Sequence, residues 1–206
     1  VGNNLIKITF PDSSVKEYES GITSLEIAKK ISNSLAKKIL VASFNGEHVD
    51  LSLKLTCDGS IKFFTWEDSE GKSTFWHSSA HLMAEAVQGL YPGVKFGIGP
   101  SIENGFYYDI DFQEYDPSEI NLSKIEKEFI RLCTSNLMFD RSEVSKKDAI
   151  KYFTEKGDEY KLELIDSLED GNITFYKQGE FTDLCKGPHI PSSKFIKSFK
   201  LLNVAG

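Results

Sequence analysis

The chain has 206 residues, of which 40% are hydrophobic and 27% charged, and its net charge is -7. This composition is typical of an ordinary globular protein of one or two domains and excludes an intrinsically disordered chain. No apolar run approaches the roughly 20 residues that span a bilayer, and the N-terminus shows no secretory signal. The three cysteines, Cys57, Cys133 and Cys185, are too few for a disulfide framework and favour a reducing, cytoplasmic environment.

The negative net charge disfavours non-specific binding of nucleic acid. The charge is uneven, however, because residues 184–206 contain four lysines (Lys186, Lys194, Lys197 and Lys200) and no acidic residue. Two interpretations stay open: a local basic surface, or an ordinary solvated face.

The first third of the chain predicts a small α+β roll. A hairpin is expected over residues 4–18, with a turn at 11–14, followed by a helix that starts at a Thr23-Ser24-Leu25-Glu26 capping box. The apolar stripe of this helix is Leu25, Ala28, Ile31 and Leu35. Further strands are expected at 39–44, 47–51 and 60–66, with an Asn45-Gly46 turn between the first two, and the polar residues 67–73 predict a linker.

The remaining residues predict a second α+β domain around a helix that starts at Ser73 or Thr74 and ends before Pro92-Gly93. Its core stripe is expected at Trp76, Ala80, Met83, Val87 and Leu90. His77, His81 and Glu85 (or Gln88) form the adjacent stripe, at the edge of the buried face. The other expected elements are a hairpin over 96–112 with a return strand at 106–112, helices at 117–136, 146–156 and 160–168, strands at 139–144, 173–177 and near 195–202, and a loop with Asp183, Cys185 and His189.

Two of the four histidines, His77 and His81, are spaced i, i+4, so they lie roughly 40° apart on a helix and project from one face. Such a pair suits a metal or acid/base site, or a hydrogen-bonded role in the core. Ser78 occupies the place of the general-base Glu in H-E-x-x-H, which disfavours zinc-protease chemistry. His48, beside Asn45-Gly46, is expected to be a surface turn residue.

Cys185 and His189 flank Lys186-Gly187-Pro188, and the Gly-Pro pair predicts a turn that lets both side chains point into one pocket. Asp183 would share the side of Cys185 if the backbone there is extended. Cysteine is also a common small buried hydrophobe, and Cys57 and Cys133, which have no histidine nearby, are predicted to be structural.

These motifs resemble the N-terminal half of bacterial threonyl-tRNA synthetases, over essentially the whole chain. The resemblance is carried by the HSSAHL string at 77–82, GIGP at 97–100, NGFYYD at 104–109 and DLCKGPH at 183–189. It implies an α+β protein: a TGS-like β-grasp domain at 1–66, and at 67–206 an editing domain with a mixed or antiparallel sheet and a histidine-bearing helix, similar to one in alanyl-tRNA synthetases. It also implies a longer natural protein, because the family continues past Gly206 into an aminoacylation core, which holds ATP and a catalytic zinc, and an anticodon-binding domain.

Threonine and serine differ by one methyl group, so a threonine pocket rejects serine by only about 1–3 kcal/mol. The resemblance implies a proofreading fragment that hydrolyses the ester of seryl-tRNA(Thr) and spares threonyl-tRNA(Thr), in a pocket too small for that methyl group. The candidate catalytic residues that it implies are His77, His81, Cys185, His189, Lys161 and Asp183, with Tyr108 and Gly99 on the substrate side.

Ester hydrolysis needs an activated water, a stabilised oxyanion and a proton for the leaving 3′-oxygen. A histidine could activate the water, Lys161 could stabilise negative charge, and Asp183 could bind the serine α-ammonium or orient a lysine. The resemblance favours editing without a metal, although His77, His81, Cys185 and His189 could hold Zn²⁺. The expected partner is the seryl-adenosine end of tRNA(Thr), with no membrane, and family members are homodimers.

The TGS-like domain shows no catalytic residues and is expected to help bind tRNA or to pack as an appendage. Two other functions stay open. The chain could be a non-catalytic binding module with a structural zinc site, whose four protein ligands would leave no open position. It could also be a free-standing deacylase that acts in trans, which differs only in whether the chain continues beyond Gly206.

Overall fold

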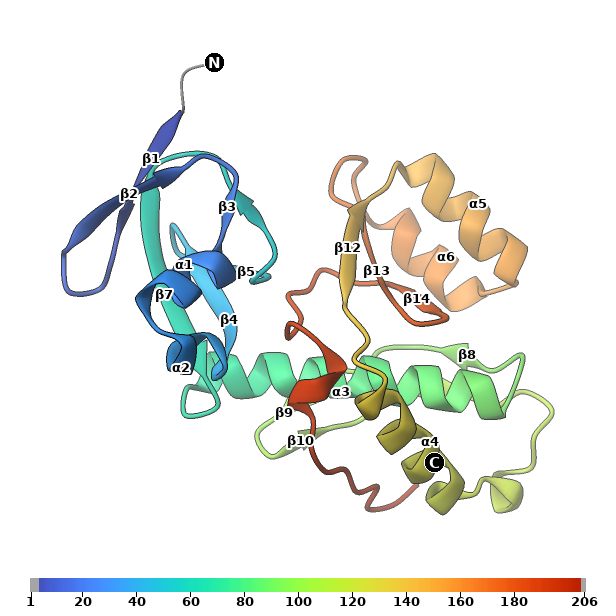
Figure 1. Cartoon of the computed structure of the whole chain (residues 1–206). Helices are drawn as coiled ribbons and strands as arrows, with labels where there is room; N and C mark the ends of the chain where they lie inside the picture. The colour runs from blue at the N-terminus through green and yellow to red at the C-terminus, as the bar shows by residue number, and fades with distance from the viewer. Residues whose placement is uncertain (1–3, 205–206) are drawn as a thin grey trace. The chain divides into compact units, whose positions relative to one another are not determined.

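A computed structural model describes residues 4–204, which form an α+β structure with parallel and antiparallel strand pairs (Figure 1). They divide into two compact units: residues 4–75 with 187–191, and residues 76–186 with 192–204. The α+β fold class expected from the sequence is therefore confirmed. Among the described residues, no helix is both long and apolar enough to cross a bilayer.

The first unit is built on a five-stranded sheet in the order β2-β1-β7-β4-β5, in which only β1 and β7 are parallel neighbours. Helix α1 packs against this sheet, because Ile27 and Ala28 share one buried cluster with strand residues such as Ile8. The arrangement is that of a β-grasp domain. Its elements are β1 (Leu5–Thr9), β2 (Val15–Glu19), β3 (Ile22–Thr23), α1 (Ser24–Ile31), α2 (Asn33–Ala36), β4 (Ile39–Phe44), β5 (Glu47–Val49), β6 (Lys54–Leu55) and β7 (Gly59–Thr65).

Helix α1 begins at the predicted capping box. The Glu26 N–H donates to Thr23 Oγ1 at 3.2 Å, and the Glu26 carboxylate accepts from the Thr23 N–H at 2.8 Å. The predicted apolar stripe is wrong at Ile31, which is 41% exposed, whereas Ile27 is fully buried. The reason is that α1 ends at Ile31, and Leu35 belongs to the separate turn α2, which Ser32 caps.

The turn between β4 and β5 is formed as predicted, with positive φ values at Asn45 (53°) and Gly46 (89°). His48 does not lie in this turn but in β5, where it is exposed and its ring meets Phe64 edge-on at 5.5 Å. The surface position expected for His48 is confirmed, and its place in a turn is wrong.

The second unit combines the long helix α3 (Ser69–Leu90), of which it contains residues 76–90, with a three-stranded antiparallel sheet in the order β12-β13-β14. Helices α5 and α6 contact each other (Figure 1). Phe153, Ile165 and Phe175 join them to the sheet in one buried cluster. The other elements are β8 (Lys95–Phe96), β9 (Ser101–Ile102), β10 (Gly105–Phe106), β11 (Ile110–Asp111), η1 (Pro117–Glu119), α4 (Leu122–Thr134), β12 (Asp140–Glu143), α5 (Lys146–Lys156), α6 (Glu159–Asp166), β13 (Thr174–Gln178), β14 (Phe181–Leu184) and η2 (Ser193–Phe195).

Helix α3 starts at Ser69, earlier than the predicted start at 73 or 74, so most of the predicted linker is helical. The Thr65 N–H donates to Asp68 Oδ2 at 2.8 Å, and the chain turns into the helix directly after β7. Gly71 permits this close turn, because a Cβ atom there would overlap the Thr65 carbonyl.

The middle of α3, residues 78–87, is buried all round rather than on one stripe. His81 is only 3% exposed, so its predicted place at the edge of the buried face is wrong, whereas His77 is half-buried. The helix is buried on all sides because the small side chains of Ser78, Ser79 and Ala80 let neighbouring elements approach it closely.

Three predicted segments also differ, two of them strands and one a loop. The return strand over 106–112 is split, because β10 pairs with β9 whereas β11 pairs with β8. Residues 181–184, expected in a loop, form β14. Within the described chain, residues 196–204 form no strand; Phe199 instead stacks on Phe129 of α4, with ring centroids 3.6 Å apart.

Candidate functional site

Helix α3 brings His77 and His81 together as the i, i+4 spacing predicts. Their ring centroids lie 4.9 Å apart at an interplanar angle of 70°. The His81 ring also meets the edge of Phe181 of β14 at 6.0 Å. The two imidazoles therefore lie one helical turn apart, and one of them faces the strand that carries Asp183.

Cys185 follows β14 directly and is held by Thr174 of the neighbouring strand. The Cys185 N–H donates to the Thr174 carbonyl at 3.0 Å, and the Thr174 hydroxyl donates to the Cys185 carbonyl. This fixed backbone places Cys185 Sγ 3.1 Å from His77 Nε2. The proton lies on the sulfur or on the nitrogen according to the tautomer of His77.

Asp183 of β14 forms a buried ion pair with Lys161 of α6. Lys161 Nζ is 2.9 Å from Asp183 Oδ1, and both side chains are 4% exposed. The Tyr108 hydroxyl donates to Asp183 Oδ2 at 2.9 Å. Asp158 caps α6 by accepting from the Lys161 N–H at 3.2 Å, which sets where the lysine leaves the helix. We call Lys161, Asp183 and Tyr108 the Lys161 network.

The glycine segment before β9 connects the histidines to the Lys161 network. Lys161 Nζ donates to the Gly97 carbonyl at 2.9 Å. His77 forms a hydrogen bond with the Gly99 backbone. A Cβ atom on Gly99 would lie 2.5 Å from the Tyr108 ring, so no side chain fits there. The GIGP string is thus needed for close backbone approach.

Burial controls the charge of the histidines. It lowers the pKa of His77 below 6.5, opposed by the Gly99 hydrogen bond and the Asp183 charge. Burial, His77 and Lys161 together hold the pKa of His81 well below 6.5. Burial and Asp183 likewise keep the pKa of Tyr108 well above 10. At pH 7 both imidazoles are therefore mainly neutral and Tyr108 is a hydroxyl donor.

His189 is placed by a different set of contacts. It belongs to segment 187–191, which forms part of the first unit, and it is 1% exposed. Its N–H donates to Asp50 Oδ1 at 2.9 Å. The second unit alone brings together His77, His81, Cys185, Gly99 and the Lys161 network, and the role of His189 stays a prediction.

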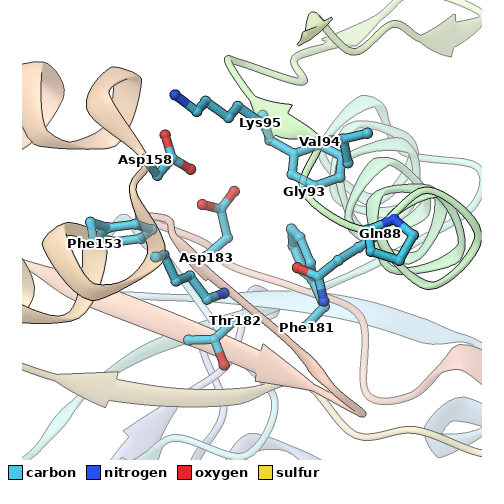
Figure 2. Close-up of a pocket in the computed structure, with 12 residues that line it drawn as sticks. Gln88, Gly93, Val94, Lys95, Phe153, Asp158, Phe181, Thr182 and Asp183 are labelled. Atoms are coloured by element: carbon cyan, nitrogen blue, oxygen red, sulfur yellow. The ribbon is translucent and has the colours of Figure 1, made fainter. Parts of the chain in front are cut away.

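A pocket of about 260 Å³ opens beside Asp183. Figure 2 shows the Asp158 and Asp183 carboxylates facing the same space, with Lys95 above Asp158. Gln88 of α3 and Phe181 of β14 line another part of it. Asp183 therefore faces this pocket with the same side chain that binds Lys161.

The donor set of His77, His81 and Cys185 fits a metal ion. Their ligand atoms belong to a group in which all atoms lie within 4.8 Å of one another. Two imidazole nitrogens and a thiolate are ligands that Zn²⁺ prefers. The three residues form a His–Cys group that could bind a metal.

The other two cysteines and the four lysines of residues 184–206 are not members of this His–Cys group. Cys133 is buried, Cys57 is exposed, and both are free thiols. Lys186, Lys194 and Lys197 are exposed, whereas Lys200 Nζ lies 3.0 Å from Glu126 Oε1. The ion pair of Lys200 is a surface pair, because its side chain is 72% exposed.

Two buried polar residues beside the site, Glu85 and Gln178, were not predicted to belong to it. Glu85 accepts from the Glu180 N–H at 3.0 Å, and Gln178 Nε2 donates to the His81 carbonyl at 3.0 Å. A carboxylate inside the apolar run 82–87 was a signal for Glu85, whereas the sequence around Gln178 contains none.

Comparison with known protein families identifies two matches. Residues 6–65 match the TGS domain, and residues 173–206 match the threonyl and alanyl tRNA synthetase second additional domain. The chain is 57% identical over 202 residues to a threonine–tRNA ligase of Cytophaga hutchinsonii, 54% to that of Parabacteroides distasonis and 52% over 203 residues to that of Porphyromonas gingivalis. These alignments cover 98% of the chain but 31% of each relative, so the chain spans about a third of their length.

Proposed function

We propose that this chain, which carries the TGS and second additional domains of threonyl-tRNA synthetases, performs their editing reaction. The reaction is hydrolysis of the ester that joins serine to the terminal adenosine of tRNA(Thr), with threonyl-tRNA(Thr) spared. The observation that supports it most is the contact between neutral His77 and Cys185 beside the buried Lys161 network.

A second site is required because one methyl group is worth only about 1–3 kcal/mol in a binding pocket. Serine enters a threonine pocket with this modest penalty, and the error must then be removed by hydrolysis. A site too small for the threonine methyl group would accept the seryl ester and exclude the threonyl ester.

In the proposed mechanism, His77 Nε2 exchanges its contact with Cys185 Sγ for a water molecule. The oxygen of this water attacks the ester carbonyl while His77 Nε2 takes a water proton. The carbonyl π electrons move to the oxygen and form a tetrahedral oxyanion. The carbonyl then re-forms, the bond to the 3′-oxygen breaks, and that oxygen takes the proton from His77. A neutral imidazole is required for the first step, and burial keeps His77 neutral at pH 7.

The Lys161 network would supply charge and position. Asp183 fixes the Lys161 ammonium, whose positive charge would stabilise the developing oxyanion. Tyr108 and Gly99 would form the substrate side, with the Tyr108 hydroxyl held by Asp183. We propose His81, next to His77, and His189, four residues after Cys185, as the remaining members of the site.

We propose that editing proceeds without a metal. If zinc is bound, His77, His81, Cys185 and His189 would hold it, and it would supply Lewis acidity and a bound water of lowered pKa. Elemental analysis and the deacylation rate in EDTA test this proposal. One equivalent of zinc, with activity that EDTA abolishes and zinc restores, would overturn it.

The wider context is also proposed. The domains would extend over 1–66 and 67–206, with the first assisting tRNA binding. The partner would be the acceptor end of tRNA(Thr). The free thiols favour a location in the cytoplasm. The whole protein would be a homodimer. Aminoacylation, with its ATP and catalytic zinc, would belong to the part of the relatives outside this alignment.

The deciding experiment is deacylation of seryl-tRNA(Thr) and threonyl-tRNA(Thr) by the 206-residue chain. We expect release of serine and retention of threonine. The other candidate, a binding module with a structural zinc site, is favoured by the His–Cys group. It predicts one tightly bound zinc per chain and equal, background rates for both esters.

A further inference from the structure

We propose that Glu85 and Gln178 are positioning residues that hold the β13–β14 hairpin against α3. They would thereby set where Asp183 and Cys185 stand relative to His77 and His81. The inference rests on the proposed editing function for its kinetic consequence. The contacts that Glu85 and Gln178 make with the hairpin and α3, which we call the clamp, are independent of that function.

Gln178, the last residue of β13, makes the first contact. Its side chain is 1% exposed, and its Nε2 atom donates to the His81 carbonyl at 3.0 Å. The bond joins the end of the hairpin to the helical turn that carries His81. A shift of the hairpin along α3 would break it.

Glu85 makes the second contact, one helical turn beyond His81. Its Oε1 atom accepts from the Glu180 N–H at 3.0 Å. Gly179 lies so close to the same oxygen that a Cβ atom there would overlap it. Gly179 also has a positive φ of 49°. The two-residue turn Gly179-Glu180 therefore fits directly onto the Glu85 carboxylate. Gln88 adds a weaker bond to the Glu180 carbonyl at 3.4 Å.

The hairpin transmits this position to the site. Gln178 pairs with Phe181 across the turn, and Tyr176 pairs with Asp183 in the same ladder. Cys185 follows immediately and is bound to Thr174 of the same hairpin. Asp183 and Cys185 thus belong to one rigid ladder whose turn is fixed to the helix of His77 and His81.

The buried polar atoms argue against simple space filling. Glu85 Oε2 and Gln178 Oε1 have no hydrogen-bond partner within residues 4–204. Each unpaired buried oxygen costs free energy that an apolar side chain of the same size would avoid. Polar groups at both positions are therefore explained by the directional bonds that their other atoms make.

The test compares E85M and Q178M, which keep side-chain volume but remove the bonds, with E85Q, whose amide oxygen can still accept from Glu180. E180A is the matched control, because it keeps the Glu180 N–H and removes only an exposed side chain. The shortened variants E85D and Q178N are a second pair if a methionine variant does not fold. Single-turnover deacylation of seryl-tRNA(Thr) and its half-saturating enzyme concentration are measured.

We expect E85M and Q178M to lower the single-turnover rate by about 10- to 100-fold, because a misplacement of about 1 Å can cost about 10²-fold, with half-saturation changed less than about twofold. E85Q and E180A should stay within about twofold of the parent chain. Rates within twofold for folded E85M and Q178M, or an equal loss in E180A, would overturn the inference.

A second readout separates the clamp from the proposed function. In ¹H–¹⁵N spectra, the His77 and His81 ring signals should shift in E85M and Q178M but not in E180A. If the parent chain does not deacylate seryl-tRNA(Thr), the proposed function fails, and these spectra still decide the clamp. Unchanged ring signals in the methionine variants would exclude it.

Discussion

His77 Nε2 and Cys185 Sγ lie 3.1 Å apart, although 108 residues separate them in the chain. The contact joins helix α3 to the segment after β14 and pairs a neutral imidazole with a thiol. Its two members should therefore act as one unit, and the loss of either should have the effect of losing both.

The first prediction concerns this pair. H77A should slow deacylation of seryl-tRNA(Thr) by about 10²–10⁴-fold, because the group that takes the water proton is lost. C185A should also slow it, and the H77A/C185A variant should be little slower than H77A. C57A is the matched control because Cys57 is exposed and should change the rate less than about twofold. Rates of folded H77A that match the parent chain would remove His77 from the mechanism.

The second prediction concerns the pH dependence of kcat/KM, which reports the free enzyme. His77 must be neutral to take a proton, and burial lowers its pKa below 6.5. The rate should therefore be higher at neutral pH than in acid and fall on acidification with a midpoint below 6.5. A ring-nitrogen NMR titration of His77 should give the same midpoint, and a midpoint above 6.5 by both methods would contradict the assignment.

Local patterns predicted the elements that depend on neighbouring residues. The Thr23–Glu26 capping box and the Asn45-Gly46 turn appear where the sequence places them, because their hydrogen bonds and dihedral angles involve residues at most three apart. The i, i+4 pair of His77 and His81 is predictable for the same reason. The fold class follows from the order of such elements.

Features that depend on tertiary contacts were not predictable in this way. Gln178 bonds to a carbonyl 97 residues away, and no local pattern marks it. His81 was expected at an edge, but its burial depends on elements that the sequence of α3 does not specify. The C-terminal residues have strand propensity, yet Phe199 stacks on Phe129 instead. In each case packing overrides the local preference.

The third prediction concerns the stability of the Lys161–Asp183 pair. Both side chains are 4% exposed, so K161M would leave an uncompensated buried carboxylate. We expect a loss of about 3–5 kcal/mol in the free energy of unfolding of the second unit. K161M/D183N should recover part of this loss, because no unpaired charge remains. Urea unfolding measures both, and a loss below about 1 kcal/mol in K161M would show that the charges are solvated.

The fourth prediction concerns tRNA binding. Lys186, Lys194 and Lys197 are exposed, and replacing all three by alanine should weaken binding of tRNA(Thr) and reduce the slope of log K against log salt by about 1 per lysine that contacts phosphate. K200A is the control, since Lys200 is engaged with Glu126. Filter binding over a salt series measures the slope. An unchanged slope would mean that these lysines contact solvent and not phosphate.

The fifth prediction concerns Glu85, a carboxylate that is 7% exposed. Burial raises its pKa from 4.5 to about 7, assisted by the negative charges of Glu180 and Glu128 and opposed by the Glu180 N–H and by Arg131. The folded state therefore binds a proton more tightly than the unfolded state. The stability that Glu85 contributes is full below pH 4.5 and is lost as the pH rises to 7.

E85Q should remove this dependence, because an amide keeps the acceptor for the Glu180 N–H without ionising. Urea unfolding from pH 4.5 to 8 should show the parent chain losing stability relative to E85Q as the pH rises, with the difference levelling off above about 7. E180A should shift the transition to lower pH, since it removes a negative charge that raises the pKa of Glu85. Parallel curves for the parent chain and E85Q would mean that folding leaves the pKa of Glu85 at its ordinary value of 4.5. The Glu180 N–H would then donate to a charged carboxylate at neutral pH.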